Sequence, residues 1–253
     1  MATAVLRNSR MSEAEWQARQ ELAACYRVFA MLGWDESIYN HITVKVPDEE
    51  DAFLINPYGL HFSEVKASNL VKIDIDGNKL DDNPYPVNLA GFTQHSVFHR
   101  HLPDAHCIAH THTTAGMAVA SLEGGLQPVN FYAANWVGQI AYHDFEGVTV
   151  RSEEGERLIE HLGDKRAMLL RNHGILVMGR TVPEAFLKHW SLQRACEIQL
   201  ATMQAGQPLT IPPEVIAVHQ RDLHKVQIPG GPGKADFDAM VRRVDKIDPS
   251  WRD

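Results

Sequence analysis

The spacing of apolar residues predicts a chain that alternates between amphipathic helices and short buried strands. Ser12-Glu13-Ala14-Glu15 and Thr181-Val182-Pro183-Glu184 each place a capping residue three positions before a glutamate, which is typical of a helix start. Pro183, in the first turn of the second predicted helix, is also typical of a helix start. Apolar positions at helical spacing predict helices over residues 12–33, 90–101, 153–162, 181–204 and 237–244, with another just after His112.

Strand-like segments are short apolar runs, at residues 42–46, 52–55, 70–74, 105–112, 167–171 and 175–178. Asp76-Gly77 indicates a tight turn after the third run. Helices and strands interleave without an internal repeat. We therefore expect one α/β three-layer sandwich, with a central, mostly antiparallel sheet flanked by helices.

The boundaries of this domain follow from the ends of the periodic pattern. Residues 1–11 precede the first helix as an N-terminal extension, and residues 12–206 form the domain. Prolines at positions 208, 212, 213, 229 and 232 predict a tail over residues 207–253 that is irregular before its last short helix. We expect this tail to pack on the domain or on a neighbouring subunit.

Composition narrows the classes of partner. The 253 residues include 24 Lys and Arg against 32 Asp and Glu, a net charge of −8, with no basic cluster that could follow a phosphate backbone. Nucleic acid and membranes are therefore not expected partners. The first residues lack the apolar core of a signal peptide, and no apolar run approaches the roughly 20 residues of a membrane span, which predicts a soluble cytoplasmic protein. Cys25, Cys107 and Cys196 lie far apart in apolar patterns, as reduced core residues do.

Three histidines carry the most specific candidate chemistry. His110 and His112 end the run at 105–112, and residues i and i+2 of a strand point to the same face. His173 ends another apolar run beside Gly174, where the backbone can turn or be approached closely. Three neutral imidazoles around a divalent cation leave at least one coordination position open, as in catalytic sites.

Spacing alone leaves two interpretations of these histidines. The chain holds 14 histidines, so a His-X-His pair can arise by chance, and a lone buried histidine is commonly a hydrogen-bonded core residue. Histidine is also the commonest metal ligand. The motifs around the three residues favour the metal.

Those motifs resemble the class II aldolase and adducin head-domain superfamily over about residues 12–206. They are Tyr39-Asn40-His41-Ile42-Thr43, Ile55-Asn56-Pro57-Tyr58-Gly59, Asn88-Leu89-Ala90-Gly91-Phe92, Pro103-Asp104-Ala105, His110-Thr111-His112-Thr113 and Leu170-Arg171-Asn172-His173-Gly174. The sequences of these motifs resemble the adducin-like bacterial branch more than the sugar-phosphate aldolases. The resemblance implies a sheet flanked by helices, a homotetramer with the metal near a subunit boundary, and His110, His112 and His173 as the metal ligands.

The cofactor that this resemblance implies is a divalent metal ion. Zn²⁺ suits three imidazoles, and Fe²⁺, Mn²⁺ or Co²⁺ stay open because nitrogen ligands select weakly. In the aldolases the metal polarises a carbonyl and stabilises the enediolate formed when a carbon–carbon bond breaks. The resemblance therefore implies a lyase that acts on a small carbonyl or hydroxy-acid substrate through a metal-stabilised enolate.

The sequence departs from the family pattern on the helix that precedes His110. Counting back places Gly91 where the aldolases carry a glutamate base, and glycine can neither accept a proton nor bind metal. A missing general base commonly costs about 10²–10⁴-fold in rate. Leu89, Ala90 and Tyr58 stand where the family has small hydroxyl residues that hold phosphate, which favours a substrate without phosphate or with a different anionic end.

Four further residues have candidate roles. Asn40 and Gly59 remain from the family's substrate pocket, although asparagine before a strand is also a common turn residue. Tyr132 aligns loosely with a tyrosine that some aldolases use as a proton donor from the neighbouring subunit, and a buried aromatic residue is the alternative. His95, one helical turn after Gly91, is a candidate replacement base or ligand, or else a core histidine.

Two other functions compete with the lyase. The same three histidines loaded with Fe²⁺ could activate oxygen, as similar superfamily members do on aromatic hydroxy acids; oxygen uptake with iron but not zinc would identify that reaction. The other is a non-catalytic adducin-like assembly module, whose histidines would only satisfy core hydrogen bonds. Adducin joins its head to a long tail with a very basic end, whereas this chain stops at Asp253, so we expect the module to be the weaker candidate.

Overall fold

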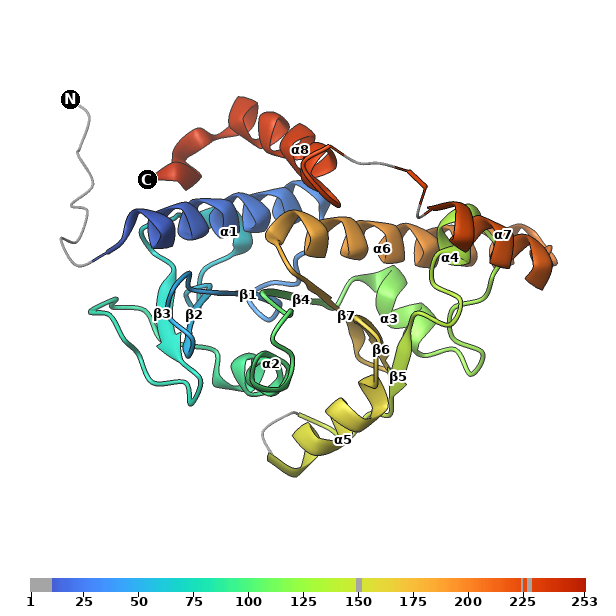
Figure 1. Ribbon diagram of the computed structural model, residues 1–253, viewed down its shortest axis with the longest axis horizontal. Coiled ribbons are helices and arrows are strands. Elements are labelled where there is room, and N and C mark those ends of the chain that lie inside the picture. The colour runs from blue at the N-terminus through green and yellow to red at the C-terminus, as the bar shows by residue number, and fades with distance from the viewer. Residues whose placement is uncertain (1–10, 149–151, 224, 227–228) are drawn as a thin grey trace.

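The computed structural model of the chain describes residues 11–148, 152–223, 225–226 and 229–253 (Figure 1). Within them, one sheet has the strand order β3-β2-β1-β4-β7-β6-β5, and every pair of neighbours is antiparallel except the parallel pair β5 and β6. The mostly antiparallel sheet is confirmed. Its strands are β1 (His41–Lys45), β2 (Ala52–Ile55), β3 (Val71–Asp74), β4 (Cys107–Thr111), β5 (Ala141–His143), β6 (Ala167–Leu170) and β7 (Gly174–Gly179).

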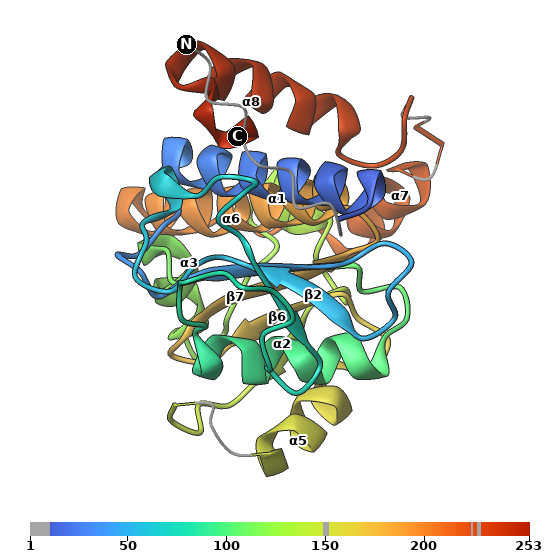
Figure 2. The ribbon, with the colours of Figure 1, turned by 90° about the vertical axis from the view of Figure 1, so that its left-hand side faces the viewer.

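Helices cover both faces of this sheet, so the expected three layers are confirmed. Figure 2 shows α1 (Glu13–Leu32) and α6 (Val182–Ala205) on one face, and α2 (Leu89–His101) and α5 (Ser152–Leu162) on the other. The main core lies under α1 and α6, and a second apolar cluster lies between the sheet and the pair α2 and α5. The remaining helical elements are η1 (Phe62–Glu64), α3 (Thr114–Ala120), α4 (Phe131–Ala134), α7 (Pro213–Leu223), α8 (Lys234–Ile247) and η2 (Pro249–Arg252).

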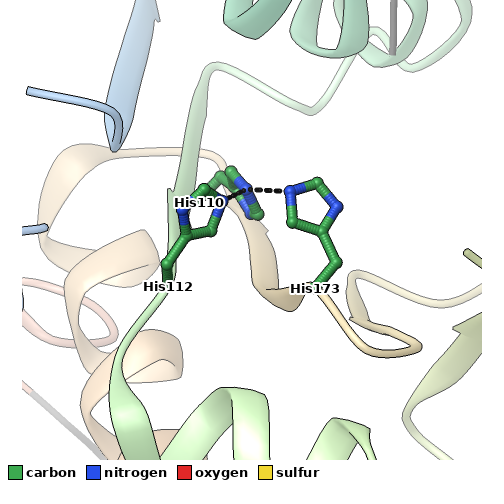
Figure 3. A group of neighbouring side chains, drawn as sticks. All are labelled: His110, His112 and His173. Carbon is green, nitrogen blue, oxygen red and sulfur yellow. Dashed lines mark hydrogen bonds between the residues drawn. The ribbon is translucent and has the colours of Figure 1, made fainter. Parts of the chain in front are cut away.

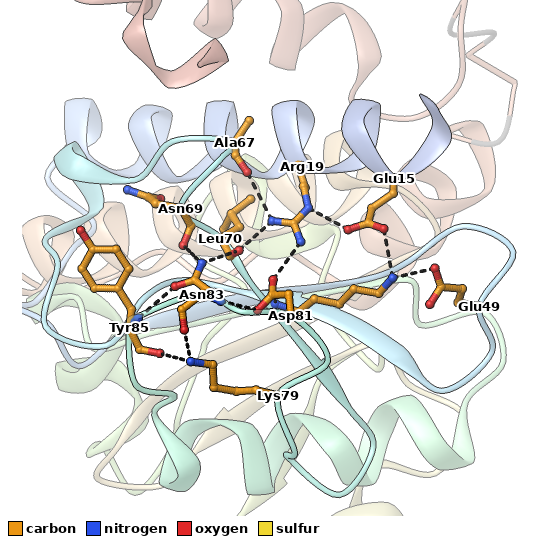
Figure 4. A network of polar contacts seen from close by, with 11 residues as sticks. Glu15, Arg19, Glu49, Ala67, Asn69, Leu70, Lys79, Asp81, Asn83 and Tyr85 are labelled. Atoms are coloured by element: carbon orange, nitrogen blue, oxygen red, sulfur yellow. Dashed lines mark hydrogen bonds and ion pairs between the residues drawn. The ribbon is translucent and has the colours of Figure 1, made fainter. Parts of the chain in front are cut away.

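Helix α1 begins and ends as its sequence predicts. The Ser12 hydroxyl accepts a hydrogen bond from the Glu15 N–H at 3.0 Å, and Gly33 closes the helix in the left-handed conformation. The Glu15 carboxylate has a further role, because it accepts hydrogen bonds from Arg19 and Lys72. Figure 4 shows the buried Arg19 guanidinium extending this network to the Leu70 carbonyl, which ties α1 to the start of β3.

The tail is more helical than its prolines suggest, so the expectation of an irregular segment is wrong for α7. Pro213 is the first residue of that helix, where a missing N–H costs no intrahelical hydrogen bond. Helix α8 also begins earlier and ends later than predicted. It packs outside α1 and α6 (Figure 2). Its buried Phe237 contacts Phe186 of α6.

Two further expectations concern the cysteines and the membrane. Cys25, Cys107 and Cys196 are free and buried, as predicted. Among the described helices, none combines the length and apolar character that a membrane crossing requires.

Candidate metal centre

The end of β4 and the turn between β6 and β7 bring His110, His112 and His173 together (Figure 3). His110 lies in β4, a strand bordered by β1 and β7, and His112 follows directly after that strand ends. His173 lies in the turn between β6 and β7, after Asn172, whose φ of 57° is left-handed. The Nε2 atom of His110 lies 2.8 Å from Nε2 of His112 and 3.3 Å from Nε2 of His173.

A hydrogen bond fixes which nitrogen of His110 faces its companions. Its Nδ1 lies 2.9 Å from the Ile175 carbonyl oxygen, which can only accept, so Nδ1 carries the proton. Nε2 therefore presents a lone pair to the other two histidines. Donation by the second ring nitrogen to a carbonyl is the usual way in which proteins orient a metal-binding imidazole.

Burial keeps the three imidazoles neutral at neutral pH. It lowers the pKa of His173 to about 4, with a further lowering from His112. Burial, followed by the neighbouring His173 and His112, also holds the pKa of His110 well below its ordinary value, and burial lowers that of His112. The neutral form is the one that binds metal.

Gly174 permits the close approach of β7 to β4 beside the cluster. A Cβ atom at this position would lie 2.3 Å from the Thr111 carbonyl oxygen, closer than any side chain permits. The predicted close approach at Gly174 is confirmed. It places His173 at the end of β4, next to His110 and His112.

A cavity of about 400 Å³ opens beside the three histidines. Among the described residues that line it, none is a lysine or an arginine. Its other walls are aromatic, amide and small side chains from several elements: Tyr39, His41, Tyr58, Asn88, Gly91, Gln94, Phe145, Gly147 and Val148. The described walls therefore offer contacts to an uncharged or aromatic group, and the residues described there offer no fixed cation to a phosphate.

His41 is a wall residue to which the sequence assigned no role of its own. It lies directly opposite His110 in the pairing of β1 with β4, and the two ring centroids are 5.2 Å apart. Its ring fills the space beside Gly91, since a Cβ on that glycine would lie 2.7 Å from the His41 Nδ1. Only the pairing of β1 with β4 could have revealed this neighbour, and the local sequence does not specify that pairing.

His95 does not reach the cavity and lies behind His41. The two ring centroids are 4.3 Å apart, and the Nδ1 of His95 contacts the Thr43 hydroxyl at 2.7 Å. The same hydroxyl contacts Nε2 of His99. His95 thus supports the wall that His41 forms.

The remaining candidate residues lie at different distances from the cluster. The Asn40 side chain donates to the Trp34 carbonyl and accepts from the backbone N–H of His112, both at 3.0 Å, so its amide group is hydrogen-bonded within the protein.

Gly59 occupies an exposed turn with φ of 100°, next to Tyr58 on the cavity wall. Tyr132 lies on α4 and packs against Trp190 of α6, and it does not line the cavity. The side chains of Leu89 and Ala90 lie outside the described residues.

The fold and the histidine cluster agree with a comparison to known families. Residues 20–200 match the profile of the Class II Aldolase and Adducin N-terminal domain. The chain belongs to this family.

Two relatives show which members of the family are similar to this chain. A Pseudomonas aeruginosa protein named "Putative aldolase class 2 protein" is 42% identical over 247 residues, covering 96% of this chain and 95% of that one. Rat alpha-adducin is 40% identical over 246 residues, which cover 90% of this chain but only 33% of adducin. The similarity to adducin therefore concerns one part of that protein.

Solved structures show the same fold. An aldolase II superfamily protein from Pseudomonas syringae superposes with a TM-score of 0.90 at 40% identity, covering 96% of this chain and 98% of that one. An L-fuculose 1-phosphate aldolase from Glaciozyma antarctica gives a TM-score of 0.83 at 26% identity, covering 94% and 93%. The chain is thus more similar in sequence to adducin than to this sugar-phosphate aldolase.

Proposed function

We propose that this protein is a divalent-metal-dependent lyase of the class II aldolase type, acting on a small carbonyl or hydroxy-acid substrate through an enolate. The observation that carries the proposal is the convergence of three imidazole nitrogens beside a cavity of substrate size. The similarity to an L-fuculose 1-phosphate aldolase over most of both chains supports the reaction class.

The chemistry of the donor set fits a divalent cation. His110, His112 and His173 are neutral donors, and the Nε2 of His110 is held with its lone pair toward the other two rings. Zn²⁺ suits such a set, in which three protein ligands leave a position for substrate or water. A cation held there would polarise a substrate carbonyl and stabilise the negative charge that develops as a carbon–carbon bond breaks.

The side chains of the described cavity wall favour a substrate without a phosphate group. Phosphate recognition commonly uses Arg or Lys, and this part of the wall carries no cationic side chain. The wall also includes the first turn of α2, through Asn88 and Gly91, and the N-terminus of a helix can bind a carboxylate as well as a phosphate. Gln94 is 2% exposed and places an amide in the wall, which can bind a carboxylate or carbonyl oxygen. Tyr39, Tyr58 and Phe145 offer apolar contact to the rest of the substrate.

Replacing His110 with alanine tests the proposal. The variant should lose bound metal and at least 10²-fold in cleavage rate in a screen of hydroxy acids, keto acids and sugar phosphates, because it removes the central donor. Metal content is measured by elemental analysis. His106→Ala is the matched control, since His106 lies four residues earlier in the same segment and is exposed. Full activity in metal-free protein would contradict the proposal.

A further inference from the structure

Gln94 differs from the other buried glutamines of the described chain. Gln193 and Gln199 use both the oxygen and the nitrogen of their side-chain amides in hydrogen bonds within the protein. Gln94 is buried to the same degree, at 2% exposed, yet its amide makes no hydrogen bond to any part of the described chain. A buried amide without partners is costly, so a ligand that pairs with it regains that cost on binding.

The amide of Gln94 can be reached from the cavity. Gln94 lines the same cavity as the three candidate metal ligands. Neither of its amide atoms is sealed from the surface, in contrast to the unpartnered ring nitrogens of His41 and His95, which are. Since only 2% of the residue is exposed, the surface that its amide retains lies on this wall.

Gln94 stands on the face of α2 that carries Gly91. The two residues are three positions apart, so they are neighbours on the helix surface, and both line the cavity. Where the resemblance to aldolases implies a glutamate, Gly91 brings no side chain to the wall. Gln94 brings a neutral amide, which can bind a substrate oxygen but cannot accept a proton as a base.

The charges around the cavity favour an anionic partner for this amide. None of the described wall residues is acidic, and the first turn of α2, which borders the cavity, also holds no acidic residue. The three candidate ligands are neutral imidazoles, so they leave the charge of a bound divalent cation uncompensated. A substrate carboxylate would compensate it, and a carboxylate accepts the hydrogen bonds that an amide NH₂ group donates.

We propose that the side-chain NH₂ group of Gln94 donates a hydrogen bond to a substrate carboxylate, and so selects hydroxy acids and keto acids over neutral carbonyl compounds of the same shape. This role rests on the proposed function, because one cavity holds both the substrate and the three-histidine centre. Gln94 is thus a specificity-determining residue.

Glycolate and glycolamide are matched probes, since they have nearly the same shape and differ in charge. In isothermal titration of zinc-loaded protein, Gln94→Met should bind glycolate at least about tenfold more weakly than the wild type, the effect of losing a hydrogen bond to a charged group. Its glycolamide affinity should fall less, because a neutral carbonyl is the weaker acceptor. Gln94→Glu removes the donor and adds a negative charge, so its ratio of glycolate to glycolamide affinity should be the lowest of the three proteins.

Two controls separate this contact from general effects. Gln204 is exposed on α6, so Gln204→Met and Gln204→Glu should bind both probes as the wild type does. Zinc affinity should be unchanged in Gln94→Met, because the amide is not one of the three candidate ligands.

A measurement on the wild type avoids dependence on variants that fail to fold. In zinc-loaded protein labelled with ¹⁵N-glutamine, glycolate should move the side-chain N–H resonances of Gln94, and glycolamide should move them less. An unchanged ratio of glycolate to glycolamide affinity in the folded variants, or unmoved resonances, would overturn the role of Gln94 and leave the metal centre intact. Absence of zinc binding by the wild type would overturn the proposed function as well.

Discussion

At the scale of single residues, His110 organises the candidate centre. Its Nε2 lies within hydrogen-bond distance of Nε2 of both other histidines, and its Nδ1 is fixed by the Ile175 carbonyl. The backbone of His112 is held in another way, because the Asn40 side chain accepts a hydrogen bond from its N–H. The resemblance implied a substrate contact for Asn40. The structure shows it bonded on both sides within the protein, which favours a positioning role.

Asn40→Ala should therefore lower metal affinity about 10–100-fold, the usual effect of removing a residue that orients a ligand. Competition with a chromophoric chelator measures this affinity. Asn40→Asp keeps the acceptor oxygen and should lose less. Asn135→Ala is the control, since its side chain contacts His219 instead. Unchanged metal affinity in Asn40→Ala would show that His112 needs no such support.

Local spacing could predict the three histidines, because His110 and His112 share a strand segment and His173 ends a neighbouring apolar run. It could not reveal His41, whose role depends on the pairing of β1 with β4 and on the approach of α2. His95 was placed correctly one turn after Gly91 on α2. Its ring nevertheless packs behind His41, a contact between elements that the helix spacing does not contain.

At the scale of elements, the packing of α2 against β1 shapes the cavity wall through Gly91. Alanine normally stabilises a helix interior relative to glycine by up to about 1 kcal/mol. Here the added Cβ meets a ring that is itself backed by His95. The steric cost of the added Cβ should therefore exceed the stability gained from the higher helix propensity of alanine.

We expect Gly91→Ala to lower the free energy of unfolding by about 1–3 kcal/mol in the wild-type background. In a His41→Ala background the same change should be neutral or stabilising, because the ring is absent. Urea denaturation of the four proteins completes this double-mutant cycle. Equal effects in both backgrounds would show that Gly91 and His41 are not coupled.

Helix ends with strong capping signals were predictable from the sequence, since both Ser12 and Thr181 cap their helices through the N–H three residues later. Helix α7 was not, because the prolines before it resemble chain breakers unless the helix starts at Pro213. Strand β5 has three residues and pairs in parallel with β6. So short a strand has no periodicity of its own, and its parallel pairing with β6 requires the crossover through α5.

At the scale of the whole molecule, several histidines are folded into apolar surroundings on both faces of the sheet. Burial lowers the pKa of His99 and of His189 to about 3. In the unfolded chain both would titrate near 6.5, so the unfolded state binds more protons between pH 6.5 and 3. Acid therefore favours unfolding.

The homotetramer and the boundaries of the domain stay predictions.

The free energy of unfolding should be nearly constant at pH 7–8 and decrease below pH 6.5. Each of these histidines should lower it by about 2 kcal/mol at pH 5. Urea denaturation of the metal-free protein across this range measures the slope. His189→Gln should fall less steeply with acid than the wild type, whatever its stability at pH 7. Equal slopes for the two proteins would mean that His189 is charged in the fold.

The central claim is that three histidines of this chain hold a divalent cation beside the cavity. X-ray absorption of the zinc-loaded protein tests it most directly, because the method counts imidazole ligands and separates nitrogen from sulfur. We predict three imidazole nitrogens at about 2.0–2.1 Å with the remaining position filled by a light atom. A shell containing sulfur at about 2.3 Å, or fewer than three imidazoles, would contradict the account.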